Sequence, residues 1–236
     1  FFKNSKLPLL VSFYGRDVAE ANKYKFLYKL LFKRAKYVLV LSKHMKETLI
    51  KTGCHHNKII IHHLGIDCKD FYFPDRKYLN KKTINILVVA NFVEKKGLKL
   101  LLNSFHELLK EYPNCRLKLV GRGPLENQLK EKVSLLDMNK KVSFINNYEY
   151  SNPREIVKDS MKDADIFVLS GSEVKNDYGG TPIVLMEASA MGLACITCDN
   201  AGNSEIIKNN HSGLVVHNDK FALSRAMIKL IKDEQL

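Results

Sequence analysis

The feature that most constrains the fold is an alternation of two patterns from residue 85 onward. Short apolar runs rich in β-branched residues lie at 85–90, 116–120, 142–145, 166–169, 194–197 and 213–216. Segments with apolar residues at helical spacing lie between and after them, at 98–112, 125–136, 154–162, 182–191 and 220–232. Strands that alternate with helices form βαβ units on a parallel sheet. We therefore predict an α/β fold with a complete, six-stranded doubly wound domain here.

The first 65 residues predict fewer elements, namely strands at 9–13, 37–41 and 59–62 and helices at 19–34 and 44–51. That is about half of a Rossmann-like domain. Residues 65–83 contain Pro74, Asp75 and many polar residues, which is typical of a linker. We predict that residues 1–78 are the C-terminal part of an incomplete N-terminal domain plus linker, and that residues 79–236 form a second domain. Roughly a hundred further residues are expected before Phe1, because such domains usually have about 150.

The composition favours a globular protein. Hydrophobic residues make up 45% of the chain, but no run of about twenty apolar residues could span a membrane. The five cysteines are an odd number and widely spaced, which favours reduced thiols and a cytoplasmic location, and we expect no disulfide framework. Cys195 and Cys198 have the spacing of half a zinc site, but they lie on a predicted strand and no second pair exists, so we interpret them as structural.

The formal net charge of +13 favours anionic partners such as phosphates, acidic lipids or nucleic acid, without choosing among them. The lysines are spread along the chain instead of forming one stripe with interleaved aromatic residues. We therefore expect no nucleic acid among the partners, although a basic nucleic-acid-binding module stays an alternative. Four histidines, His55, His56, His62 and His63, do not suggest a metal site, since neighbouring residues on a strand point to opposite faces.

The segment from Gly179 to residue 192 has the pattern of an anion site. Thr181 can cap a helix and Pro182 suits its first turn, so the free amides and the positive end of the helix dipole point back toward Gly179 and Gly180. Glycines let a diphosphate approach the backbone closely, and Glu187 can accept hydrogen bonds from ribose hydroxyls. An ordinary strand-to-helix loop would fit the same residues.

This segment resembles the signature of glycosyltransferase family 4, a family of retaining enzymes with the GT-B fold of two Rossmann-like domains. In that family a Glu-Gly-x-Pro run leads to a second glutamate eight positions after the first. Glu187 matches the second glutamate, whereas Gly179 stands where the first, which contacts the donor sugar, is usual.

The resemblance extends over nearly the whole chain. Residues 88–97 are similar to the family's first strand of the second domain and its basic loop: Lys96 matches the family's lysine, Asn91 replaces an arginine, and Lys95 adds a neighbouring cation. Residues 121–125 are similar to the family's Gly-x-Gly-Pro turn, with Arg122 expected in an ordinary surface role. Residues 12–18 resemble a Phe-His-Gly-x-Asp segment, with Tyr14 in place of the histidine.

The resemblance implies the transfer of a sugar from a nucleoside-diphosphate sugar to an acceptor hydroxyl with retention, by a hexosyltransferase-like enzyme similar to those of bacterial exopolysaccharide and lipopolysaccharide synthesis. It implies no cofactor and no metal. The implied catalytic residues are Lys96 and Tyr14. The implied donor-binding residues are Asn91, Lys95, Gly179, Gly180, Thr181 and Glu187, and those on the acceptor side are Gly15, Arg16 and Asp17.

The expected partners are a nucleotide sugar and a sugar or lipid-linked acceptor, in the cytoplasm or at the inner face of an anionic membrane. Because the first domain is incomplete, this stretch by itself is expected to have little or no activity. Gly179, Asn91 and Tyr14 all depart from the family pattern at cleft positions, so a non-catalytic relative that binds nucleotide stays an alternative.

Overall fold

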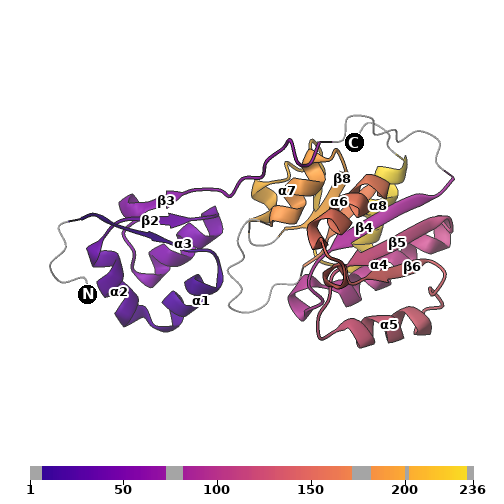
Figure 1. Cartoon of the computed structure of the whole chain (residues 1–236). Coiled ribbons are helices and arrows are strands. Elements are labelled where there is room, and N and C mark those ends of the chain that lie inside the picture. Colours follow the sequence, from indigo (N-terminus) through magenta and orange to yellow (C-terminus); the bar gives the residue numbers. More distant parts are fainter. Residues whose placement is uncertain (1–6, 73–81, 172–181, 200–201, 233–236) are drawn as a thin grey trace. The chain divides into compact units, whose positions relative to one another are not determined.

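The computed structural model describes residues 7–72, 82–171, 182–199 and 202–232. They form two compact units, with the boundary between Gly65 and Ile66 in the first part of the chain (Figure 1). Both units contain a parallel sheet with helices, so the predicted α/β class is confirmed.

The N-terminal unit is a three-stranded sheet in the order β1-β2-β3. Its strands are β1 (Leu9–Ser12), β2 (Ala35–Val40) and β3 (Ile59–Ile61), and its helices are α1 (Arg16–Lys23), α2 (Lys25–Arg34) and α3 (Lys43–Thr52), with a short 3-10 turn η1 (His56–Lys58). In Figure 1 the helices lie together on one side of the three strands. Phe13, Phe32 and Met45 are buried in the core between them.

The prediction of one helix over residues 19–34 is wrong, because the backbone leaves helical geometry at Tyr24 with φ −109° and ψ 49°. The apolar periodicity continues through this break, and neither Gly nor Pro marks it. After the break, α2 packs Tyr28 and Phe32 against Phe13, with ring centroids 6.0 and 6.1 Å from that of Phe13. Aromatic packing in the core thus accompanies a change of helix direction that the sequence pattern does not reveal.

The C-terminal end of α2 is fixed by a single side chain from η1. The Lys58 ammonium donates hydrogen bonds to the carbonyl oxygens of Phe32, Lys33 and Ala35 at 2.9, 3.0 and 2.8 Å. The last carbonyls of a helix have no intrahelical donor and lie at the negative end of the helix dipole, so a cation there both donates hydrogen bonds to them and interacts favourably with the dipole. This contact attaches α2 firmly to the segment before β3.

The second unit is a six-stranded parallel sheet in the order β6-β5-β4-β7-β8-β9, which is the doubly wound order. Its strands are β4 (Ile84–Val89), β5 (Cys115–Val120), β6 (Val142–Ile145), β7 (Ile166–Leu169), β8 (Ala194–Cys198) and β9 (Leu214–Val216). Its helices are α4 (Leu98–Glu111), α5 (Glu126–Leu135), α6 (Pro153–Asp163), α7 (Ile183–Ala190) and α8 (Lys220–Lys232), with 3-10 turns η2 (Glu94–Lys96), η3 (Asn147–Glu149) and η4 (Asn203–Glu205). The six predicted strands are confirmed, each to within one residue at either end.

Both faces of this sheet are covered. Ile86 and Val88 belong to one buried cluster, which includes side chains of α4, α5 and α8, whereas Leu87 belongs to a second cluster with side chains of α6 and α7. Successive residues of a strand point to opposite faces, so β4 contributes to both cores in turn. A sheet buried on both faces explains why its strands read as continuous apolar runs.

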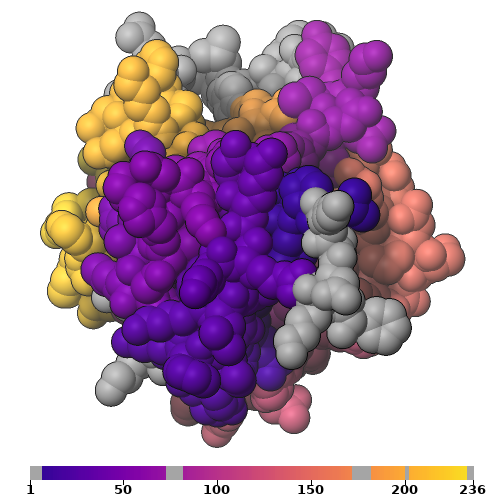
Figure 2. Space-filling view, turned by 90° about the vertical axis from the view of Figure 1, so that its left-hand side faces the viewer, coloured from indigo at the N-terminus to yellow at the C-terminus, as the bar shows by residue number. Residues whose placement is uncertain are grey.

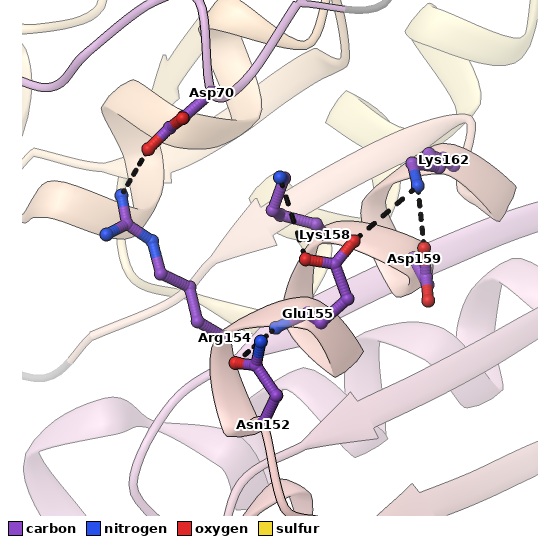
Figure 3. Close-up of polar contacts among 7 residues, drawn as sticks. All are labelled: Asp70, Asn152, Arg154, Glu155, Lys158, Asp159 and Lys162. Carbon is purple, nitrogen blue, oxygen red and sulfur yellow. Dashed lines mark hydrogen bonds and ion pairs between the residues drawn. The ribbon is translucent and has the colours of Figure 1, made fainter.

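The segment that enters the second unit is fastened to α6. Phe71 is fully buried in the second cluster, and the Arg154 guanidinium lies 5.1 Å from its ring centroid. Figure 3 shows Arg154 reaching from α6 to Asp70, at 3.7 Å, and Asn152 capping the same helix by accepting from the Glu155 amide at 3.3 Å. Lys158 and Lys162 pair with Glu155 farther along. The first turn of α6 is therefore held in a fixed position.

Candidate functional site

The candidate site of the second unit lies at the carboxyl ends of β4, β5 and β7. Ligands of doubly wound sheets bind at this edge, where loops leave neighbouring strands. β4 is the central partner here, because it pairs with β5 on one side and with β7 on the other. The predicted residues Asn91, Lys95 and Lys96 all lie on the loop that follows β4.

Two glycines press the loop after β5 against the loop after β4. A Cβ at Gly121, whose φ is +144°, would lie 2.9 Å from the Ala90 carbonyl carbon and closer still to its oxygen, and a Cβ at Gly123 would lie 2.5 Å from the Phe92 carbonyl oxygen. Backbone hydrogen bonds join the same loops, from the Phe92 amide to the Arg122 carbonyl at 2.8 Å and from the Leu125 amide to the Phe92 carbonyl at 3.1 Å. These turn glycines are therefore required by close backbone approach.

The loop after β7 holds the other side of the same segment. The buried Ser170 hydroxyl donates to the Lys96 carbonyl at 2.8 Å. Gly97, with φ +59°, packs against the backbone of Gly171, which would lie 3.4 Å from a Cβ at this position. Lys96 is half-buried, whereas Asn91 and Lys95 are exposed. The loop that carries the predicted phosphate-binding lysine is thus held at Phe92 by the loop after β5 and at Lys96 by the loop after β7.

A cationic and an aromatic side chain form a pair where the chain leaves β5 and β6 at this edge. The Arg122 guanidinium carbon is 4.2 Å from the centroid of the Tyr148 ring, and Tyr148, on η3 after β6, is 52% exposed. From the sequence alone we expect an ordinary surface role for Arg122 and no role for Tyr148. The useful signal would have been that both residues follow strands that are adjacent in the doubly wound order.

Glu187 lies in the second turn of α7 and is partly buried. Burial raises the pKa of its carboxyl above the ordinary value, and the charge of Arg154 on α6 opposes part of that rise. Hydrogen bonds donated by a ligand would stabilise the charged form of this partly buried carboxyl, which burial disfavours. α7 begins at Ile183, one residue later than predicted, and the predicted residues Gly179, Gly180 and Thr181 lie outside the described residues.

The predicted acceptor-side residues lie in the N-terminal unit, directly after β1. The Asp17 carboxylate, in the first turn of α1, accepts hydrogen bonds from the backbone amides of Tyr14, at 2.8 Å, and Gly15, at 2.8 Å, so it shapes the loop that precedes the helix. The side chains of Tyr14 and Arg16 are exposed. Asp17 thus organises the backbone that carries the other three residues.

Among the residues with described positions, no three His, Cys, Asp or Glu side chains come together in a way that could hold a metal ion. The same residues include no helix with the length and apolar character needed to cross a bilayer.

Comparison with known proteins places this geometry in context. Residues 73–236 match the profile of the family described as Glycosyl transferases group 1. The chain is 32% identical over 228 residues to the amylovoran biosynthesis glycosyltransferase AmsK of Erwinia amylovora, covering 94% of this chain and 54% of that protein. It is 30% identical over 223 residues to the putative colanic acid biosynthesis glycosyltransferase WcaL of Escherichia coli, covering 91% and 53%. The chain thus spans about half the length of the curated relatives it matches.

Among solved structures, the chain is similar to Anabaena Alr3699/HepE in complex with UDP and glucose, with a TM-score of 0.78 and 15% identity over 97% of this chain and 63% of that one. At that identity the likeness concerns the fold, and it agrees with the predicted GT-B class.

Proposed function

Since this chain belongs to the glycosyl transferases group 1 family, we propose that it provides the nucleotide-sugar-binding unit, and part of the acceptor-side unit, of a glycosyltransferase of cell-surface polysaccharide synthesis. The proposed reaction moves a glycosyl group from a nucleoside-diphosphate sugar to an acceptor hydroxyl with retention at the anomeric carbon. The observation that carries the proposal is that the loop after β4, which carries Lys96, is fixed at the carboxyl edge of the sheet: the loop after β5 bonds it at Phe92, and the loop after β7 bonds it at Lys96.

The main catalytic contribution in this proposal is electrostatic. As the sugar leaves, negative charge develops on the diphosphate, and preorganised cations and amides stabilise it without having to reorganise. Lys96 would supply the ammonium, with Lys95 and the Asn91 amide beside it. The amides at Gly180 and Thr181 and the dipole of α7 would contribute at the other phosphate. Tyr14 would face the reacting sugar, with Gly15, Arg16 and Asp17 on the acceptor side.

We further propose that the Arg122–Tyr148 pair binds the nucleobase. A guanidinium already stacked at 4.2 Å on an exposed tyrosine presents a flat cationic surface on which a base can stack. Glu187 would accept hydrogen bonds from the ribose hydroxyls, which its partly buried carboxyl favours. That the bound nucleotide of Anabaena Alr3699/HepE is UDP supports a uridine nucleotide as the first to test.

The test is turnover of the intact protein with a panel of nucleotide sugars. Lys96→Ala should lower kcat by about 10²-fold, on the scale of losing one preorganised donor to a developing charge. Lys99→Ala is the matched control: Lys99 lies three residues away, is partly exposed, and pairs with Glu94 at 2.8 Å, so its loss should change kcat by less than about twofold.

Equal turnover of the two variants would remove Lys96 from the mechanism. Tight binding of uridine diphosphate by the intact protein without turnover of any nucleotide sugar would favour the non-catalytic alternative. The proposed absence of a metal is tested in the same assay, because turnover should then persist in excess chelator.

A further inference from the structure

Hydrogen bonds of buried side chains join the carboxyl ends of β7 and β8. The Thr197 hydroxyl, on β8, donates to the Leu169 carbonyl, on β7, at 3.2 Å. The Asn203 side-chain amide, on η4, donates to the Thr197 hydroxyl oxygen at 2.9 Å and to the Cys198 carbonyl at 3.3 Å. Thr197 and Asn203 are both buried, whereas the last segments of the unit, in yellow, form part of the molecular surface in Figure 2. Water therefore competes little for these hydrogen bonds.

The same contacts lead on to Lys96. The carbonyl that Thr197 binds belongs to the peptide group joining Leu169 to Ser170, and the buried Ser170 hydroxyl donates to the Lys96 carbonyl at 2.8 Å. Leu169 and Thr197 are also register partners in the sheet, so Thr197 lies beside the point where the chain leaves β7. Hydrogen bonds and one peptide group thus connect Asn203 to the loop after β4, across three strands that are neighbours in the sheet.

We propose that Thr197 and Asn203 are positioning residues for Lys96. They fix the peptide group between Leu169 and Ser170, and Ser170 in turn fixes the backbone that presents the lysine. Buried polar networks of this kind rigidify the groups that they join. A displacement of about 1 Å at a reacting centre can cost about 10²-fold in rate, so the network matters for catalysis if Lys96 stabilises the leaving diphosphate. The catalytic consequence rests on the proposed function, whereas the hold on the loop does not.

The direct test is hydrogen exchange of the intact protein, measured on peptides that cover η2. The Lys96 amide donates to the Val93 carbonyl and the Gly97 amide to the Glu94 carbonyl, both at 3.0 Å, so both amides report on the order of this loop. Thr197→Val keeps the shape of the side chain but removes two hydrogen bonds, and the net loss of one changes an opening equilibrium by about two- to tenfold. Exchange of the two amides should therefore become about tenfold faster, whereas Thr197→Ser, which keeps the hydroxyl, should stay within about twofold of the original rate.

Ser104→Ala is the matched control, because the buried Ser104 hydroxyl donates to the Leu100 carbonyl within α4, at 3.0 Å. It should change neither the exchange of the Lys96 amide nor kcat. If Thr197→Val does not fold, Asn203→Ala carries the test, and it should make the Lys96 amide exchange at least about twofold faster. The proposal is overturned if Thr197→Val lowers the Tm but leaves the exchange of the Lys96 amide unchanged, or if Ser104→Ala accelerates this exchange equally.

Turnover of a nucleotide sugar separates a positioning role from a purely structural one. Thr197→Val should lower kcat about tenfold while the KM for the donor changes by less than about twofold. When Lys96 is already alanine, the same substitution should lower kcat by less than about twofold further, because it acts through Lys96. A loss of about tenfold in both backgrounds would overturn the proposal. Equal turnover of Lys96→Ala and Lys99→Ala would instead refute the proposed function, and exchange of the Lys96 amide would still decide whether Thr197 holds the loop.

Discussion

Gly121 offers the sharpest test of how the candidate site is built. Its φ of +144° is one that side chains rarely adopt, and a Cβ there would collide with the Ala90 carbonyl group, whose carbon would be 2.9 Å away. The backbones of Ala90 and Gly121 cannot move apart freely, because each is held by a hydrogen bond: the Ala90 amide donates to the Val120 carbonyl at 3.0 Å, and the Gly121 amide donates to the Ile145 carbonyl at 2.9 Å. Gly121→Ala therefore has to strain the loops after β4 and β5 together.

The magnitude follows from two costs. Holding alanine in this backbone region costs about 1–3 kcal/mol, and inserting a methyl group into a filled space costs about 1–3 kcal/mol. The sum, about 2–6 kcal/mol, should lower the Tm of the second unit by at least about 4 °C. Because the same shift displaces Arg122 and the backbone near Lys96, nucleotide affinity should fall as well.

The assay is thermal unfolding followed by circular dichroism, with Gly65→Ala as the control. No atom lies within 4 Å of a Cβ built at Gly65, so alanine there should leave the Tm unchanged or raise it slightly by restricting the unfolded chain. If Gly121→Ala unfolds within about 1 °C of the unsubstituted protein and binds nucleotide normally, the close approach of these two loops does not constrain the site.

Two further predictions concern titration and reactivity. Because burial raises the pKa of Glu187 in the folded protein, its charged form destabilises the fold at neutral pH, and this penalty disappears as the pH falls below its folded pKa. Glu187→Gln should therefore raise the Tm at pH 7 and have a smaller effect on the Tm near pH 4. An equal change in Tm at both pH values would contradict the desolvation argument. Burial raises the pKa of the Cys115 and Cys198 thiols to about 11, whereas Cys68 is exposed. A thiol reagent at pH 8 should therefore modify Cys68 in the native protein long before those two, and fast modification of Cys115 or Cys198 would show that the second unit opens easily.

Much of the second unit could be predicted from sequence because its strands are buried on both faces. The apolar runs at 142–145 and 166–169 coincide with β6 and β7. The helical periodicity of residues 98–112 predicts α4, which ends one residue earlier, at Glu111. The boundary of α7 was predicted nearly as well. The N-terminal unit was harder: β2 begins two residues earlier than predicted, and the helix break at Tyr24 has no marker in the sequence.

The candidate site divides in the same way. Lys96 and Glu187 could be selected from sequence, because chemistry and family resemblance restrict which residue types follow a strand or open a helix. The stacking of Arg122 on Tyr148 could not, since these residues are 26 positions apart and meet only when β5 and β6 pair. The structural role of Asp17, whose carboxylate accepts hydrogen bonds from the amides of its own loop, could not be predicted either.

The sequence by itself determined the periodicities, and with them the order of strands and helices, because burial imposes a local pattern on each element. Only the tertiary structure decided which loops touch, as in the contact of Gly121 with Ala90 and the hydrogen bond from Ser170 to the Lys96 carbonyl. Contacts between distant segments depend on how the strands are ordered in the sheet, and no local pattern encodes that order.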